Sequence, residues 1–288
     1  MGAVIASHPS VGYIHEPFKP STSGGICAGP FAHWFTYVSR ENEEFFLDPV
    51  ARTLGFSYST AVALRECRSP RAVARVAHDY LAFARARRAK ARPLVKDPLA
   101  FFSAEWLADR FGMQVIVLVR HPAAFASSLK RLGWSSHSFS HFLRQPLLMR
   151  DLLAPYRRDI ERMANNRPDV IEQAALLWKI IYGTAVRYQA RHADWIFVRH
   201  EDISRNPLGE FSRLLDRLGL GLTPQVRRLI DETSSSQNPR QILKPHDIHV
   251  DSRANVASWK NRLTSQEIER TRSYVGSLSD AFYSADEW

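Results

Sequence analysis

The chain has 288 residues, of which 45% are hydrophobic and 24% are charged, and its formal net charge is +10. This length and composition are typical of a globular protein, which we expect to form a single domain over residues 1–288. The sequence contains no run of 18 apolar residues, so it predicts no membrane-spanning helix. The first residues lack the basic and apolar stretches of a signal peptide. The two cysteines have no metal-binding spacing, so we expect a reduced, cytoplasmic protein.

In the first part of the chain, the apolar pattern predicts a helix that ends near His8, a strand over 11–14, a helix over 60–91, a strand over 94–96, and a helix over 104–111 with Ser103 as its N-cap. The positive charge is densest from Arg85 to Arg92, where basic residues alternate with alanine. Such a surface attracts polyanions, but this pattern is more typical of a solvated helix end. We therefore predict no nucleic-acid partner.

In the second part, the pattern predicts a strand over 115–119, an irregular region over 137–170, a helix over 171–191, a strand over 196–198, a helix over 208–218 that closes at Gly219, and a last helix over 265–283. Apolar strands separated by helices indicate an α/β fold with a central parallel sheet flanked by helices.

The segment of residues 114–131 is the most informative part of the sequence. An apolar run ends on Arg120, Pro122 can start a helix, and Ser127 and Ser128 follow within its first two turns. An arginine at the carboxyl end of a strand and hydroxyls on the next helix converge where open α/β sheets bind ligands, and they suit a phosphate or sulfate. The alternative is that Arg120 is a solvated strand end and the serines are ordinary helix residues.

Arg120-His121-Pro122, with a serine eight positions after the arginine, resembles the 3′-phosphate-binding segment of sulfotransferases that use 3′-phosphoadenosine 5′-phosphosulfate (PAPS). By this resemblance, Arg120 and Ser128 bind the 3′-phosphate of the donor. The family also implies a P-loop NTPase-like three-layer fold.

Further segments resemble the same family in the same order, so the likeness covers nearly the whole chain. Lys96-Asp97-Pro98 resembles its third strand, and Val198 to Asp202 resembles the "RYED" region of many bacterial and carbohydrate-specific members. Asp251 to Asn255, followed by Trp259, resembles the C-terminal loop that closes over the nucleotide. In that loop a basic residue binds the 3′-phosphate, and Arg253 is the best match.

One part of the family pattern has no match. The family's 5′-phosphosulfate loop is rich in glycine, serine and threonine, carries a basic residue, and cradles the 5′-phosphate at a helix N-terminus. Its place is just before Ala3, where this sequence begins with Met1. We expect the first strand and this loop to be missing from the given sequence, either by truncation or because the protein is a degenerate member.

Two residues are candidates for the chemistry itself. Many cytosolic members place a catalytic histidine two residues after the lysine of the third strand, and Pro98 stands there instead. Glycan-specific members often use a glutamate shortly after the first helix, and Glu16 fits that position as general base or, alternatively, as a structural residue. Lys96 could contact the sulfonate or a substrate group, or simply pair with Asp97 or Glu201. His15, beside Glu16, should point to the opposite side of its strand.

The resemblance implies an enzyme that moves a sulfuryl group from PAPS to a hydroxyl or amine of a carbohydrate, lipid or small molecule. A degenerate nucleotide- or polyanion-binding protein and a P-loop kinase remain alternatives, and the acceptor and the oligomeric state stay open. We predict no metal site, because the loop histidines match no zinc motif; they are His137, His141, His246 and His249.

Overall fold

The computed structural model describes residues 1–288 except for 21–24, 66, 134–138, 167–168, 236 and 240–250. The chain divides into two compact units, each of which is described by itself. The first comprises residues 1–113 with 145–148, and the second comprises 114–144 with 149–288. No helix in the described ranges is both long and apolar enough to cross a bilayer.

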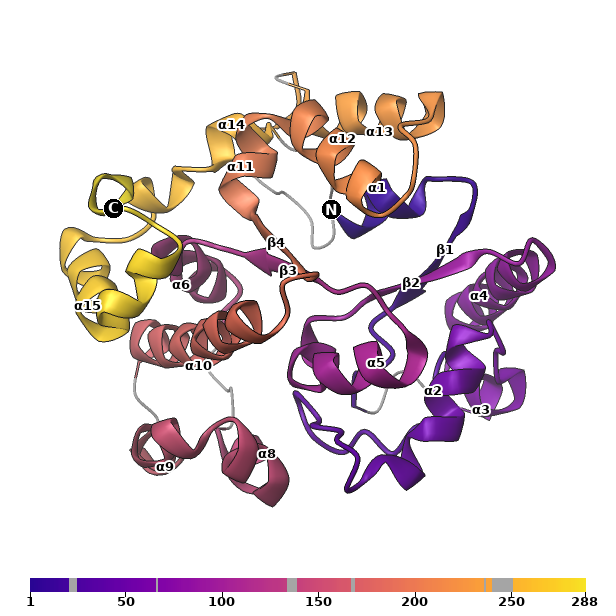
Figure 1. The fold of residues 1–288 in the computed structure, drawn as a ribbon, viewed down its shortest axis with the longest axis horizontal. Helices are drawn as coiled ribbons and strands as arrows, with labels where there is room; N and C mark the ends of the chain where they lie inside the picture. The colour runs from indigo at the N-terminus through magenta and orange to yellow at the C-terminus, as the bar shows by residue number, and fades with distance from the viewer. Residues whose placement is uncertain (21–24, 66, 134–138, 167–168, 236, 240–250) are drawn as a thin grey trace. The chain divides into compact units, whose positions relative to one another are not determined.

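The first unit is built on two parallel strands, β1 (Val11–His15) and β2 (Arg92–Lys96), with His15 opposite Lys96. Its helices are α1 (Gly2–Ala6), α2 (Leu47–Leu54), α3 (Thr60–Arg65), α4 (Pro70–Arg88) and α5 (Ala104–Phe111), with short 3₁₀ turns at Glu43–Phe45 and Pro98–Ser103. Helix α1 packs against both strands, and α4 packs against β1 (Figure 1).

A small hydrophobic core joins α4 to β1. Ile14, Phe56 and Phe83 are each at most 5% exposed and pack together. Gly12 lies directly under the ring of Phe56, so a Cβ atom at this position would collide with that ring. Glycine is therefore required here because aromatic packing comes so close to the strand backbone.

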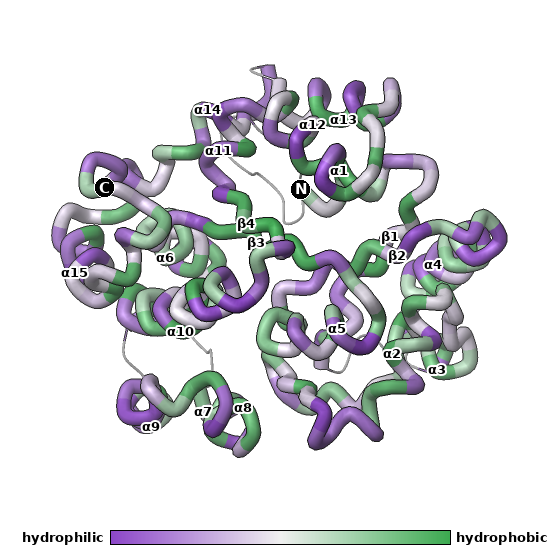
Figure 2. Tube along the Cα trace, in the orientation of Figure 1, coloured by the Kyte–Doolittle hydropathy of each residue, from purple (hydrophilic) through white to green (hydrophobic). Residues whose placement is uncertain are grey.

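The second unit contains the parallel pair β3 (Ile116–Val119) and β4 (Ile196–Arg199). Both strands are strongly hydrophobic (Figure 2). The helices are α6 (Pro122–Arg131), α7 (Ser140–Leu143), α9 (Arg157–Asn166), α10 (Val170–Arg191), α11 (His200–Arg205), α12 (Pro207–Arg217), α13 (Pro224–Ser234), α14 (Ser252–Asn255) and α15 (Ser265–Val275), while α8 (Pro146–Asp151) crosses the division between the units. Short 3₁₀ turns lie at Ala154–Tyr156, Ser258–Asn261, Gly276–Ala281 and Ala285–Glu287.

Helix α10 forms the core of the second unit. It is buried along most of its length, including the fully buried Trp178 and Tyr188, and it packs against α6 and α15 (Figure 1). Capping residues explain several of the boundaries. Asp169 caps α10, and Thr264 with Glu267 forms a capping box at the start of α15. The predicted α/β fold, with parallel strands and helices packed against them, is confirmed.

Four local predictions differ from the structure. The helix expected over 60–91 is broken, because Ser69 is extended and Pro70 starts a new helix. The region expected to be irregular contains α7, α8 and α9 in its described part. The last helix ends at Val275, because Gly276 has a φ of +56°. Ser103 makes no N-cap bond, since its Oγ donates to the Thr36 carbonyl and accepts from the Val38 N–H instead.

Candidate anion-binding and catalytic residues

Arg120 lies directly after β3, at the edge where the carboxyl ends of β3 and β4 meet. Two aromatic side chains of α10 fix its main chain. Tyr182 Oη accepts a hydrogen bond from the Arg120 N–H at 3.2 Å, and Trp178 Nε1 donates to the Arg120 carbonyl at 2.8 Å. The backbone of Arg120 is therefore held in place without using its guanidinium.

Four buried side-chain atoms have no hydrogen-bond partner in the part of the chain that the structure describes. They are Arg120 Nε, His121 Nε2, Ser127 Oγ and Arg199 Nε. All four can donate a hydrogen bond, and they lie at the carboxyl ends of β3 and β4 or on α6. Arg199 Nε still lies 3.5 Å from Asp202 Oδ2 in an ion pair, so the donors without any acceptor are those of Arg120, His121 and Ser127. Burying a donor without an acceptor costs about 1–3 kcal/mol, and an anion bound here would supply the missing acceptors.

Burial also affects the charge of Arg120. Desolvation lowers the pKa of its guanidinium, and the nearby Glu201 carboxylate opposes this effect. A guanidinium keeps its charge over the whole accessible pH range. The result is a permanently charged, poorly hydrated donor with no hydrogen-bonded counter-ion at Nε. Such a group favours an anionic ligand.

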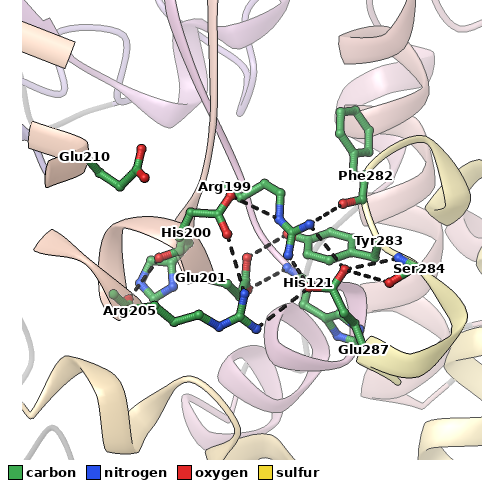
Figure 3. Close-up of polar contacts among 12 residues, drawn as sticks. His121, Arg199, His200, Glu201, Arg205, Glu210, Phe282, Tyr283, Ser284 and Glu287 are labelled. Atoms are coloured by element: carbon green, nitrogen blue, oxygen red, sulfur yellow. Dashed lines mark hydrogen bonds and ion pairs between the residues drawn. The ribbon is translucent and has the colours of Figure 1, made fainter. Parts of the chain in front are cut away.

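His121 follows Arg120 and is surrounded by aromatic rings, of which Figure 3 shows Tyr283. Its ring stacks on Trp259 at a centroid distance of 4.8 Å and an interplanar angle of 11°, and Tyr283 meets it edge-on. Its Nδ1 accepts the Ala123 N–H at 3.2 Å as the N-cap of α6. The ring is therefore neutral and carries its proton on Nε2. Burial lowers the pKa of His121 to about 4.

Glu201 connects this turn to the C-terminal segment. Its carboxylate is 3% exposed and accepts the His121 N–H at 3.0 Å and the Tyr283 hydroxyl at 2.8 Å. Arg199 extends the same network, since it lies over the Tyr283 ring and pairs with Glu287 (Figure 3). The "RYED"-like motif pointed to this segment, but Glu201 was considered only as a possible partner of Lys96 and not as a link to the C-terminal segment. Glu201 and Tyr283 are 82 residues apart, so no local sequence pattern predicts their hydrogen bond.

The other two predicted donor-binding residues belong to the same unit as Arg120. Ser128 lies on α6 and is half-buried. Arg253 lies on the short helix α14, is exposed, and follows the N-cap Asp251. Helix α14 packs against α11 and α13.

Glu16 and Lys96, the predicted catalytic residues, belong to the first unit and form an ion pair. Lys96 Nζ lies 2.6 Å from Glu16 Oε1. Glu16 has a φ of +48°, a strained value for a residue other than glycine, and its N–H donates to the Lys96 carbonyl. This backbone turn also brings His15 to 3.8 Å from the Glu16 carboxylate, whereas regular strand alternation predicted opposite sides.

The ion pair sets the protonation state of Glu16. Burial raises the pKa of its carboxyl group, but the hydrogen bond and charge of Lys96 outweigh this effect, so the pKa is lowered. Glu16 is therefore a carboxylate at neutral pH, able to accept a proton but held by Lys96. Within the first unit, Lys96 forms its ion pair with Glu16, and the charge of Lys96 also acts on Asp97, the partner considered from the sequence.

Asp97 has a different role beside this pair. Its carboxylate accepts the Phe18 N–H at 2.7 Å and the Leu99 N–H at 2.8 Å, and burial raises its pKa to about 6. It thereby ties the turn after β1 to the end of β2. The Lys-Asp-Pro motif is visible in the sequence, but this link is not, because Phe18 and Asp97 are 79 residues apart.

The described residues contain no group of three His, Cys, Asp or Glu side chains that could hold a metal ion. Three of the four loop histidines lie outside the described residues, namely His137, His246 and His249.

Comparisons with known proteins identify the family of the chain. No curated protein matches the sequence. Among solved structures, the sulfotransferase domain of the Synechococcus PCC 7002 olefin synthase has 16% identity and a TM-score of 0.48, with 98% of this chain and 88% of that chain covered. The sulfotransferase domain from the curacin biosynthetic pathway has 13% identity and a TM-score of 0.45, covering 94% of this chain and 96% of that one. The model of the sulfotransferase family matches residues 33–224, well over half of the sequence, and the chain therefore belongs to the sulfotransferase family.

Proposed function

We propose that this sulfotransferase uses PAPS as its donor and transfers the sulfuryl group to a hydroxyl or amine of a carbohydrate, lipid or small molecule. In this proposal Arg120, Ser128 and Arg253 bind the 3′-phosphate of the donor. The observation that supports it best is that the buried donors Arg120 Nε, His121 Nε2 and Ser127 Oγ, at the end of β3 and along α6, have no hydrogen-bond partner among the described residues. A phosphate offers several acceptor oxygens, and an arginine fork is the side chain best suited to bind it.

The donor supplies an activated sulfuryl group, whose bond to the 5′-phosphate breaks as a bond to the acceptor oxygen or nitrogen forms. The protein has to position the reactants and stabilise charge on the transferring group. We assign Glu16 to accept the proton that the acceptor loses. Lys96 keeps Glu16 ionised before the reaction, which is the state that a base requires.

The two cysteines, Cys27 and Cys67, are both free thiols. Free thiols are typical of a reducing compartment. We therefore infer a cytoplasmic location for the reaction.

The test of the donor site compares two nucleotides by calorimetry. Arg120→Ala should weaken binding of 3′-phosphoadenosine 5′-phosphate by about 2–3 kcal/mol, as expected for loss of a charge-assisted contact. Binding of adenosine 5′-phosphate, which lacks the 3′-phosphate, should change far less. Arg227→Ala, an exposed arginine on α13, provides the matched control. Equal losses for the two nucleotides in Arg120→Ala would remove the assignment.

One observation favours a second candidate, a nucleotide-binding protein without catalysis. The ion pair with Lys96 lowers the pKa of Glu16 and so weakens it as a base. Transfer of labelled sulfuryl groups from PAPS to a panel of glycan and phenol acceptors distinguishes the two. Transfer to any acceptor supports the enzyme, whereas tight nucleotide binding with no transfer across the panel supports the binding protein.

A further inference from the structure

Helix α4 carries an exposed apolar stripe that lies outside the hydrophobic core of its unit. Val73, Ala77, Tyr80 and Leu81 share one face by their spacing of four, seven and eight residues. Val73, Tyr80 and Leu81 are 46%, 44% and 49% exposed. Leu64, on the adjoining helix α3, is also 49% exposed. We call the four α4 residues the α4 apolar stripe.

This stripe is separate from the side of α4 that faces the core. Phe83, on the core-facing side, is only 5% exposed and packs against Ile14 and Phe56. A helix in a globular unit normally needs one apolar face. The second apolar face of α4 is therefore about half exposed, beyond the one apolar face that packing within its unit requires.

A basic stripe runs along the same helix beside the apolar one. Arg71, Arg75 and Arg85 lie on the adjoining face, and all three are exposed. Residues 65–92 contain nine Lys or Arg and two acidic residues, which gives +7 of the net +10 of the whole chain. Within the described residues, these three arginines form no ion pair, while Asp79 interacts with His78.

We propose that the α3–α4 face binds the surface of an anionic lipid bilayer. Helices that lie in the membrane interface have this arrangement, with an apolar stripe that enters the headgroup region and adjacent cations that contact lipid phosphates. The 19 residues of α4 extend about 28 Å, which suits a flat, extended charged surface. A nucleic acid would engage the cations and leave Val73 and Leu81 without a partner. The proposal does not depend on the sulfotransferase reaction.

Flotation with unilamellar vesicles tests the proposal on the full chain. The protein should bind vesicles that contain phosphatidylglycerol and should bind pure phosphatidylcholine vesicles far more weakly. Arg71→Gln with Arg75→Gln should reduce binding about 30-fold, since each basic side chain at an anionic surface contributes roughly fivefold. Tyr80→Ser with Leu81→Ser should reduce it about tenfold through lost apolar insertion.

Two double variants serve as matched controls. Arg227→Gln with Arg228→Gln removes the same charge from α13, and Phe45→Ser with Leu47→Ser removes exposed apolar side chains from another part of the first unit. Both should bind vesicles like the unmodified chain. The proposal is overturned if vesicles do not bind, if the controls lose as much as the α4 variants, or if duplex DNA binds more tightly than vesicles and independently of Tyr80 and Leu81.

Discussion

Mild acid should destabilise the protein through His121. The ring is buried between Trp259 and Tyr283 and neutral, and desolvation lowers its pKa from 6.5 to about 4. The charged groups that act on it are Glu287, which favours protonation, and Lys260 and Arg199, which oppose it. In the unfolded chain the same ring takes up a proton near its ordinary pKa.

The sign and size of the effect follow from these two pKa values. Because the folded pKa is the lower one, the stability contributed by neutral His121 is complete above about pH 6.5 and is lost as the pH falls toward 4. The full difference corresponds to about 3 kcal/mol, since a tenfold change in proton affinity is worth about 1.4 kcal/mol. About 2 kcal/mol of it should disappear between pH 7.5 and pH 5.

Urea unfolding, followed by circular dichroism at pH 7.5 and pH 5, measures this loss. His121→Asn retains an acceptor for the Ala123 N–H but has no imidazole to protonate. Between pH 7.5 and pH 5, its free energy of unfolding should therefore fall by about 2 kcal/mol less than that of the unmodified chain. His78→Asn, at a largely exposed histidine, should behave like the unmodified chain. The same acid-induced loss in His121→Asn and in the unmodified chain would refute the reasoning.

Two further predictions concern the proposed catalytic residue and the network beside Arg120. Glu16→Gln should reduce sulfuryl transfer about 10²–10⁴-fold, the usual contribution of a positioned base, and should leave the affinity for 3′-phosphoadenosine 5′-phosphate unchanged in calorimetry. Retention of most of the turnover would make Glu16 a structural residue. Glu201→Gln should lower both the free energy of unfolding and that affinity, because its carboxylate holds the turn after Arg120, whereas Tyr283→Phe should lose only one hydrogen bond, about 1 kcal/mol. Unchanged nucleotide affinity in Glu201→Gln would show that Arg120 is held without it.

The sequence was sufficient to predict the elements that local patterns define. The apolar run before Arg120 and the proline after it predicted β3 and α6, and the structure has both. A serine followed by a proline also marks the start of a helix at Ser69-Pro70. This pair breaks the helix that apolar periodicity alone predicted as continuous. Boundaries of this kind depend on neighbouring residues and are accessible from the sequence.

The contacts between distant residues could not be predicted in the same way. The Glu16–Lys96 pair depends on the register of two parallel strands and on a left-handed backbone turn at Glu16. The bond between Glu201 and Tyr283 depends on the path of the C-terminal segment. Neither has a periodic signal, because the partners meet only after the chain has folded.

A crystal structure with 3′-phosphoadenosine 5′-phosphate tests the central claim most directly. The claim predicts 3′-phosphate oxygens at about 3 Å from Arg120 Nε and from the hydroxyl of Ser128, the distance of a charge-assisted hydrogen bond. A nucleotide bound with its 3′-phosphate away from Arg120, or no nucleotide bound in that unit, would contradict it.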